Sequence, residues 1–413
     1  MSNKERNMIV SIMVVLIPLG AFAAGWFTND YVRYLRGVSS PTLLTNTAVA
    51  QGDIGLFWEA WHLVENNFIG DLPDEKELSY AAIRGAMASL NDPYTVFLEP
   101  QVRDQEQISL RGNFGGIGAY VERNEAGEVV LVPIPGNPAA EAGIVDGDVL
   151  LAIDGVPVTA EMTTEEIAAS IRGEKDTAVV LTVLHPGETD PTDISVTRGD
   201  ILVPSVFARL LPDQPDIGYI QLSRFSGESA NEMADTLQDL QEQGIKALVI
   251  DLRGNGGGLL DASVDIADQF VSNGDLLYQQ SRTNGERVYS ATAEDIAPDL
   301  PLVVLVDGNT ASAAEILAGA LQDTGRAELV GTVTFGKGSV QLVYDLSDGS
   351  SIHVTSARWF TPNRNEIDQQ GLTPDILIAP TEEGLANGRD EILEEAINYL
   401  RDNVDLVAEE PTS

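Results

Sequence analysis

Three segments of this chain hold residue types and spacings that could carry out acyl transfer. The first is Asp251–Gly258, where four glycines occupy five consecutive positions from Gly254 onward. Glycine lets the backbone adopt positive φ and come close to a ligand, and the exposed N–H groups of such a loop can hold an anion or an oxyanion. The segment lacks the Gly-Lys-Ser/Thr ending of a phosphate-binding loop. A plain glycine turn is the alternative interpretation.

The second segment is Val304–Glu315, in which an apolar strand leads through a tight turn to a helix that begins near Ser312. The spacing of Ser312 and Glu315 is that of a helix capping box, which is a sufficient structural reason for the serine. A serine at a helix N-terminus is also well placed as a nucleophile, because the N–H of the next residue, Ala313, can face a developing oxyanion.

The third segment is Phe335–Gln341, where Lys337 lies between two glycines. An exposed lysine has a pKa near 10.4 and cannot accept a proton at neutral pH, but burial disfavours the charged form and lowers that value. A neutral amine could then take the proton from a serine hydroxyl. In an extended segment Gln341 would share a face with Lys337 and could orient it. A lysine in a surface turn is the alternative interpretation.

The amino-acid composition argues against several kinds of catalytic site and partner. The chain has 413 residues, no cysteine and three histidines, none in an HExxH spacing, so thiolate chemistry and a zinc peptidase site have no support. The 24 basic and 64 acidic residues give a formal net charge of −40, which repels nucleic acid and anionic lipid headgroups. We therefore expect no nucleic-acid partner. His62 and His185 are interpreted as surface residues.

An apolar segment near the N-terminus predicts export. Met8–Phe27 contains 20 residues without a charge, long enough to span a bilayer as a helix, and Lys4 and Arg6 precede it. We expect a signal anchor that is not removed, with the rest of the chain outside the cytoplasm. A cleaved signal peptide, ending near the small residues around Ala23, is the alternative.

The elements that must position the three segments follow from hydrophobic periodicity. Helices are predicted at 57–64, 77–90, 163–172, 229–243, 313–321 and 390–403. Strands are predicted at 117–122, 129–133, 149–153, 179–184, 217–222, 246–252 and 302–306. The pattern predicts a small helical region, then a β-rich module, then an α/β layer in which strands buried on both faces alternate with helices.

These residues resemble the carboxyl-terminal processing peptidases, or tail-specific proteases, of family S41. The family pattern contains a D-L-R-x-N-x-G-G loop, matched at 251–258, and an S-A-S-A-S-E-I run, matched as T-A-S-A-A-E-I at 310–316. It also contains F-G-K-G-x-V-Q, matched at 335–341, with the lysine 25 positions after the serine, as here. The chain departs from the pattern at Thr310 and Ala314, where the family has serine, and at Gly256, where proline is common.

The resemblance extends to the rest of the chain. Asn91–Thr95 resembles a turn of the family's N-terminal region, and the segments 114–118 and 136–148 resemble its PDZ domain. The resemblance implies a serine endopeptidase that selects protein substrates by free, apolar C-termini and uses no cofactor or metal. PDZ domains bind a chain end by strand addition, and the matching loop contains Gly116, Ile117, Gly118 and Ala119.

The resemblance also assigns roles within the peptidase core. Ser312 would be the nucleophile, Lys337 the general base and Gln341 the residue that orients it. The N–H groups of Gly258 or Gly257 and of Ala313 would form the oxyanion hole. Asp323 falls where some family members have a supporting carboxylate, although a structural role at the end of its helix is the simpler interpretation.

The resulting prediction is a multidomain α/β protein with an N-terminal transmembrane helix, a small helical region, a PDZ domain and a crotonase-like peptidase core. The predicted ranges are a signal anchor or signal peptide at 1–28, a linker at 29–52, the helical region at 53–105, the PDZ domain at 106–202, the core at 203–380, and a C-terminal helix with an acidic tail at 381–413. The expected partners are substrates and, through the N-terminal helix, a membrane; a homodimer or an activating partner is left open.

Two other classes of function stay open from sequence alone. The α/β layer with its glycine loop also resembles crotonase-type enzymes, which act on thioesters; the PDZ module and the export signal argue against that interpretation. A PDZ scaffold that does not cut is the second alternative. The presence of Ser312, Lys337 and Gln341 argues against it.

Overall fold

The computed structural model describes residues 54–292 and 295–403, and the chain divides into two compact units, 1–79 and 80–413. In the first unit the described helix is α4 (Ile54–Asn67), which has no buried residue. Helix α5 (Glu75–Ala88) crosses the boundary between the units. His62 lies exposed on α4, as predicted from the sequence, and its Nδ1 is 2.8 Å from Glu65 Oε2.

The predicted fold class needs a correction at the N-terminus. It included a transmembrane helix, but no helix in 54–292 or 295–403 is long and apolar enough to cross a membrane. The segment Met8–Phe27, on which that prediction rested, lies outside the described residues. The rest of the predicted architecture, an α/β protein with a β-rich module and an α/β core, agrees with the structure.

The β-rich module follows helix α6 (Pro100–Arg111). Its main sheet has the order β3-β4-β5-β7-β8 with β6 paired to β5, and β2 pairs separately with β9. The strands are β2 (Asn113–Gly116), β3 (Ala119–Arg123), β4 (Val129–Pro133), β5 (Asp148–Ile153), β6 (Val156–Pro157), β7 (Ala178–Leu184), β8 (Thr192–Thr197) and β9 (Gly199–Leu202), and the helices are α7 (Pro138–Glu141) and α8 (Thr164–Ile171). Strand β3 lies at the edge of its sheet, so one of its sides is unpaired.

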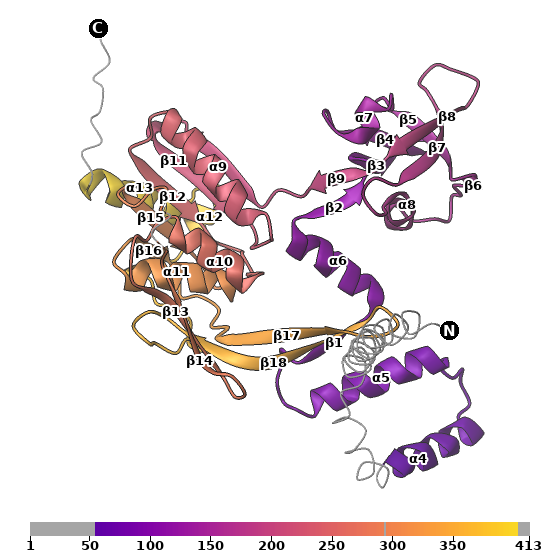
Figure 1. Ribbon diagram of the computed structural model, residues 1–413, viewed down its shortest axis with the longest axis horizontal. Helices are drawn as coiled ribbons and strands as arrows, with labels where there is room; N and C mark the ends of the chain where they lie inside the picture. Colours follow the sequence, from indigo (N-terminus) through magenta and orange to yellow (C-terminus); the bar gives the residue numbers. More distant parts are fainter. Residues whose placement is uncertain (1–53, 293–294, 404–413) are drawn as a thin grey trace, which may run out of the picture. The chain divides into compact units, whose positions relative to one another are not determined.

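The core is built on a six-stranded sheet of order β10-β11-β12-β15-β16-β19, parallel except for β10 (Figure 1). Its strands are β10 (Val206–Leu211), β11 (Gln214–Leu222), β12 (Ala247–Asp251), β15 (Leu302–Val306), β16 (Glu328–Gly331) and β19 (Ile376–Leu377). Its helices are α9 (Ser229–Glu242), α10 (Leu260–Asp268), α11 (Ala313–Asp323), α12 (Glu382–Ala386) and α13 (Glu391–Asn403).

Alternation along the central strands explains how both faces of this sheet are covered. Leu248 and Ile250 pack in the cluster that contains buried side chains of α9, α10 and α11, whereas Ala247 and Val249 pack in the cluster that contains α13. All five residues of β12 and all five of β15 are buried. This burial on two faces is why both strands read as continuous apolar runs in the sequence.

A second sheet of the core joins distant segments. It has the order β1-β18-β13-β14, with β17 also paired to β18. The strands are β1 (Val96–Leu98), β13 (Asp275–Ser281), β14 (Gly285–Ser290), β17 (Ser339–Asp345) and β18 (Ser351–Phe360). Because β1 pairs with β18, the turn at Asn91–Thr95 is brought to the strands that follow Lys337.

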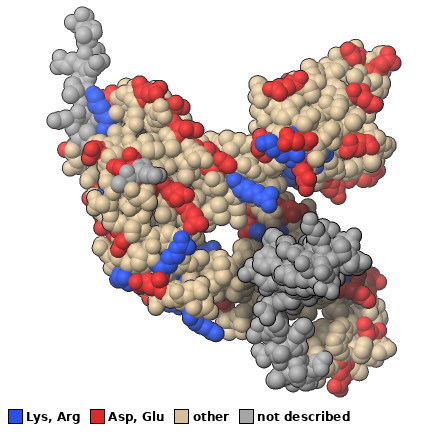
Figure 2. Space-filling model, in the orientation of Figure 1, with Lys and Arg blue, Asp and Glu red and all other residues tan. Residues whose placement is uncertain are grey.

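Acidic side chains are spread over the visible face of the molecule in Figure 2 rather than gathered in one patch. This distribution fits the net charge of −40 and the interpretation of that charge as a solvated surface.

Each predicted helix and strand overlaps an observed one, but many observed elements were not predicted, among them α6, α10, β13, β14 and β17. The strands at 129–133 and 302–306 match β4 and β15, and the helix at 229–243 matches α9 to within one residue. The predicted domain boundary between 105 and 106 falls inside α6. The domain boundaries otherwise stay predictions.

Candidate active site

Ser312 lies where strand β15 turns into helix α11, in a backbone conformation that non-glycine residues rarely adopt. Its φ is 56° and its ψ is −119°. Such a conformation costs free energy and persists only where its surroundings enforce it. The chain enters this turn through Ala311, whose N–H donates to Asn255 O at 2.9 Å, and the helix begins when Ile316 N–H donates to Ser312 O at 2.9 Å.

The buried carboxylate of Glu315 joins Ser312 to the loop that carries Lys337. Its Oε2 accepts the N–H of Ser312 at 2.9 Å and the N–H of Lys337 at 2.9 Å. Its Oε1 accepts the hydroxyl of Thr334 at 2.6 Å and the N–H of Gly336 at 2.7 Å. The residue is fully buried. The capping box predicted from the sequence is therefore half of a larger arrangement that fixes two segments 25 positions apart.

The backbone of Lys337 is held on both sides. Besides the N–H bond to Glu315, its carbonyl accepts the indole N–H of Trp359 at 3.0 Å. The preceding Gly336 has φ of 87°, and a Cβ there would lie 2.8 Å from Gly371 N, so this close turn requires glycine. Burial lowers the pKa of Lys337 below its ordinary value, while the negative charges of Glu106 and Glu315 oppose that shift.

Ser312, Lys337 and Gln341 line one cavity of about 320 Å³, together with Gly258 and Ala313. Within the described chain, no hydrogen bond joins Lys337 Nζ to Ser312 or to Gln341. Nζ instead lies 5.0 Å from the centre of the Tyr94 ring. The amide of Gln341, expected to orient the lysine, donates to Ser339 Oγ at 2.9 Å and to Thr355 Oγ1 at 3.3 Å.

The glycine loop presents one of its two candidate N–H groups to this cavity. Gly257 N–H donates to Asn255 Oδ1 at 2.9 Å and is therefore occupied. Neither Gly258 N–H nor Ala313 N–H has a hydrogen-bond partner among the residues described, and both residues line the cavity. Gly258 has φ of 145°, and a Cβ there would lie 2.0 Å from Phe225 O, so no other residue fits. Gly258 and Ala313 are thus the pair that can hold an anion.

Side chains that sequence reasoning did not single out hold the glycine loop in place. Asn255 is fully buried, and its Nδ2 donates to Leu222 O at 2.7 Å. Asp251 accepts Arg253 Nη2 at 2.6 Å and the hydroxyl of Tyr219 at 2.6 Å, and Arg253 continues to Asp390. Burial, together with the bond to Asp251, raises the pKa of Tyr219 to about 12. In the sequence, the Asp-x-Arg-x-Asn spacing was the pattern that could have indicated this network.

A pair of ionisable side chains on the cavity wall was also missed. Glu106 of α6 and His353 of β18 both line the cavity, with His353 Nε2 3.1 Å from Glu106 Oε2. Arg103 donates to Glu106 at 2.7 Å and to Asp345 at 2.8 Å. These residues come from an unpredicted helix and an unpredicted strand pair, so no local pattern could have grouped them. Asp323, by contrast, lies outside this cavity and accepts Asn363 N–H at 2.9 Å.

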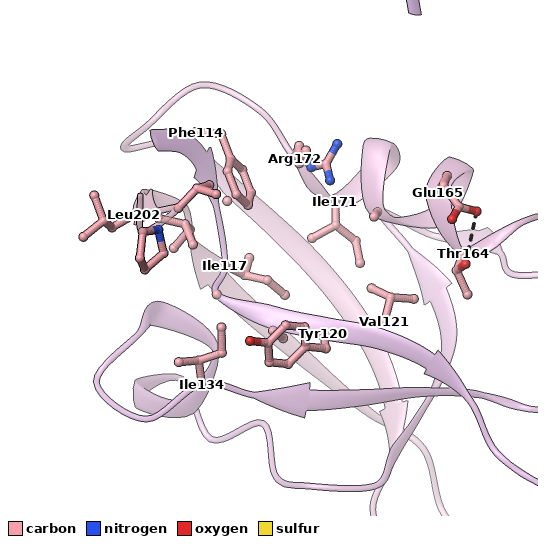
Figure 3. Close-up of a pocket in the computed structure, with 17 residues that line it drawn as sticks. Phe114, Ile117, Tyr120, Val121, Ile134, Thr164, Glu165, Ile171, Arg172 and Leu202 are labelled. Atoms are coloured by element: carbon pink, nitrogen blue, oxygen red, sulfur yellow. Dashed lines mark hydrogen bonds between the residues drawn. The ribbon is translucent and has the colours of Figure 1, made fainter. Parts of the chain in front are cut away.

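The predicted tail-binding loop lines a separate groove of about 400 Å³ in the β-rich module (Figure 3). The groove lies along β3, the unpaired edge strand, and Ile117, Val121 and Ile171 contribute apolar side chains to it. The N–H groups of Ile117 and Gly118 donate no hydrogen bond to any described residue. The carbonyls of Ile117 and Gly118 accept Ala139 N–H and Ile134 N–H, which fixes the loop. An apolar chain end that adds to β3 would therefore find donors for its carboxylate.

The chain is similar to known protein families and to individual proteins. The model of peptidase family S41 matches residues 216–378, and a PDZ domain model matches residues 129–184. A carboxyl-terminal-processing protease of Synechocystis sp. is 40% identical over 322 residues, which cover 77% of this chain and 75% of that protein. A carboxy-terminal-processing protease of Bartonella bacilliformis is 34% identical over 327 residues, 78% of this chain and 74% of that protein.

Among solved structures, a photosystem II D1 C-terminal processing protease is 35% identical, with coverage of 78% of this chain and 86% of that one and a TM-score of 0.44.

The first prediction concerns Glu315. Glu315→Gln replaces one of two accepting oxygens by an amide donor, so two of the four bonds are lost inside the protein. We expect the free energy of unfolding to fall by about 2 to 5 kcal/mol, because a buried polar group left without its partner bears its full desolvation cost. Thr334→Val removes the hydroxyl that donates to Glu315 and accepts Leu372 N–H, and should cost about 1 to 3 kcal/mol. Urea unfolding measured by near-UV circular dichroism compares the variants; equal stability of wild type and Glu315→Gln would contradict this role.

Proposed function

This chain belongs to the carboxyl-terminal-processing proteases of peptidase family S41, and we propose that Ser312 and Lys337 together carry out its peptide-bond hydrolysis. The observation that carries the proposal is the shared carboxylate: Glu315 binds the backbone of both residues, and both side chains line one cavity. The strained backbone at Ser312 supports the same assignment, because strain of this kind concentrates at functional sites.

In the proposed reaction the neutral amine of Lys337 accepts the proton of the Ser312 hydroxyl while Ser312 Oγ attacks the substrate carbonyl carbon. The resulting ammonium then protonates the leaving amine as the peptide bond breaks, which leaves an acyl-enzyme on Ser312. A water molecule, deprotonated by the same amine, attacks the ester; the bond to Ser312 Oγ breaks, the ammonium returns the proton to Oγ, and the new C-terminus is released. Burial supports this role, because it lowers the pKa of Lys337 and so raises the fraction of neutral amine.

We place the oxyanion between Gly258 N–H and Ala313 N–H. Both groups are free to donate in the described structure and both residues line the cavity, whereas Gly257 N–H is bonded to Asn255. Two backbone donors that face the developing negative charge stabilise the transition state without any reorganisation of the protein. Gln341 Nε2 donates to Ser339 and Thr355, so Gln341 Oε1 is the atom that would accept the amine of Lys337.

We further propose that the PDZ domain selects substrates by a free C-terminus that ends in an apolar residue. The chain end would add to the unpaired edge of β3, its carboxylate would accept the N–H groups of Ile117 and Gly118, and its last side chain would lie among Ile117 and Ile171 (Figure 3). Gly116 and Ala119 complete the loop. This mode of recognition depends on the terminal carboxylate rather than on a long sequence.

The acyl-transfer alternative at a thioester is less well supported. Relatives of 34% and 40% identity over most of the chain carry the name of proteases, and a PDZ domain has no evident part in thioester chemistry.

We also propose that the enzyme acts outside the cytoplasm. The support is sequence alone: the apolar run Met8–Phe27 follows Lys4 and Arg6, the order found in export signals.

The second prediction tests the catalytic pair. The full chain is incubated with an unfolded protein that ends in an apolar residue, beside Ser312→Ala and Lys337→Ala. We expect cleavage to fall by more than about 10³-fold in both variants. Ser347→Ala and Lys246→Ala change the same residue types at exposed positions and should cleave as wild type does. In wild type, kcat/KM should rise with pH through a midpoint below the ordinary pKa of lysine, because Lys337 must be neutral. No cleavage by wild type, or equal cleavage by all variants, contradicts the proposal.

The third prediction tests tail selection. Ala168 lines the groove from α8, and its neighbour Ala169 is exposed on the same helix. Ala168→Asp places a carboxylate where the apolar tail would lie, so we expect KM for a substrate with a free apolar C-terminus to rise by about tenfold or more. Ala169→Asp, with the same charge change, should leave KM unaltered. The same substrate with an amidated C-terminus should bind wild type as weakly as it binds Ala168→Asp; indifference of wild type to amidation would argue against carboxylate recognition.

The fourth prediction tests location. The full chain and a version without residues 1–28 are produced in a bacterium, and antibody detection follows cell fractionation. We expect the full chain outside the cytoplasm and the shortened chain inside it, because removal of the apolar run removes the export signal. Retention of both proteins in the cytoplasm would overturn the proposed location.

A further inference from the structure

The ammonium group of Lys337 lies against an aromatic ring. Its Nζ is 5.0 Å from the centre of the Tyr94 ring, within the distance at which the negative face of an aromatic ring attracts a cation. Lys337 forms no ion pair with a carboxylate, and Nζ no hydrogen bond, within the part of the chain that is described. The ring is thus the group that receives the amine in this structure.

The backbone of Lys337 cannot move easily to change this contact. Glu315 holds its N–H at 2.9 Å, and Trp359 holds its carbonyl at 3.0 Å. Only the conformation of the flexible four-carbon side chain can therefore determine whether the amine lies on Tyr94 or at Ser312. Any approach of the amine to Ser312 must come from rotation of this side chain.

The position of the Tyr94 ring is also fixed by the fold. Asp92 accepts Tyr94 N–H at 3.1 Å and the hydroxyl of Thr95 at 2.6 Å, which closes the turn. Thr95 Oγ1 in turn accepts Thr355 N–H at 3.1 Å, and β1 pairs with β18 immediately afterwards. The turn is anchored to the strand next to the one that carries Gln341.

Other charged groups face the same amine from the surrounding elements. Glu106 of α6 and Glu315 of α11 favour its protonated form, and burial disfavours it. His353 of β18 lines the cavity beside Glu106. Asp92 and Asp368 act on the Tyr94 hydroxyl, whose pKa burial and these charges raise, so Tyr94 stays neutral. These groups are common to every variant compared below.

We propose that Tyr94 is a positioning residue that holds the protonated form of Lys337 on its ring, and that the amine reaches Ser312 only after leaving the ring. The proposal rests on the Ser312–Lys337 pair proposed above. An uncharged amine has little attraction to the ring face, so loss of the proton from Lys337 favours its release from the Tyr94 ring. In the same way, release from the ring favours loss of the proton.

The sign of the effect follows directly. A ring that stabilises the cation raises the pKa of Lys337, against the lowering caused by burial. Without the ring, the pKa should fall further and the neutral amine should be more abundant at any pH near the midpoint. A typical contact of this kind corresponds to a shift of about 0.4 to 1.5 pH units.

The fifth prediction measures that shift without reference to activity. The chain has only five lysines, so ¹³Cε-labelled lysine gives few signals, and Lys337→Arg identifies the one from position 337. We expect the titration midpoint of Lys337 in Tyr94→Phe, which keeps the ring, to equal that of wild type. In Tyr94→Leu and Tyr94→Met it should fall by about 0.4 to 1.5 pH units. The second aliphatic variant serves if the first does not fold.

The acid limb of the pH profile of kcat/KM should move with the titration. It should shift to lower pH in the aliphatic variants and stay in place in Tyr94→Phe. Equal midpoints for the aliphatic variants and wild type would overturn the role of the ring, as would a fall in Tyr94→Phe as large as in Tyr94→Leu. If wild type cleaves nothing, the proposed function fails, yet the titration still decides whether Tyr94 holds Lys337.

Discussion

The site depends on one buried carboxylate. Glu315 is fully buried and accepts four hydrogen bonds from Ser312, Thr334, Gly336 and Lys337. A carboxylate in the protein interior is tolerated only when its oxygens are fully bonded, and bonds to a charged acceptor are stronger than bonds between neutral groups. Without any one of these segments, the Glu315 carboxylate would lie in an apolar interior with some of its hydrogen bonds missing. The helix start at Ser312 and the loop around Lys337 must therefore form together.

The parallel sheet supplies the second constraint, because the carboxyl ends of neighbouring parallel strands lie at the same edge. The glycine loop follows β12, the turn to Ser312 follows β15, and the loop to Lys337 follows β16. Three short segments distant in sequence thus meet by topology alone. Topology does not set the distances between these segments. Those distances are fixed by the hydrogen bonds from Ala311 N–H to Asn255 O and from Lys337 N–H to Glu315.

These relations explain how much could be predicted from the sequence. Local signals located Ser312, Lys337 and the glycine loop, and strands buried on both faces read correctly as apolar runs. Glu315 was predicted as a helix cap, but its bonds to Gly336 and Lys337 span more than 20 residues, which no local pattern reports. The contact of Tyr94 with Lys337 depends on the pairing of β1 with β18, which joins segments some 260 residues apart and which single-sequence periodicity cannot indicate.

Lys337 and His353 both line the cavity, but different groups hold them. His353 Nε2 lies 3.1 Å from Glu106 Oε2, and Arg103 binds the same carboxylate, so this histidine belongs to a cluster of ionisable side chains on the cavity wall. The amine of Lys337 has no such partner within the described residues, and its backbone shares an anchor with Ser312. A base must be free to lose and regain a proton beside its nucleophile. Lys337 shares a backbone anchor with Ser312 and its amine has no carboxylate partner among the described residues, so it fits the base role proposed for it.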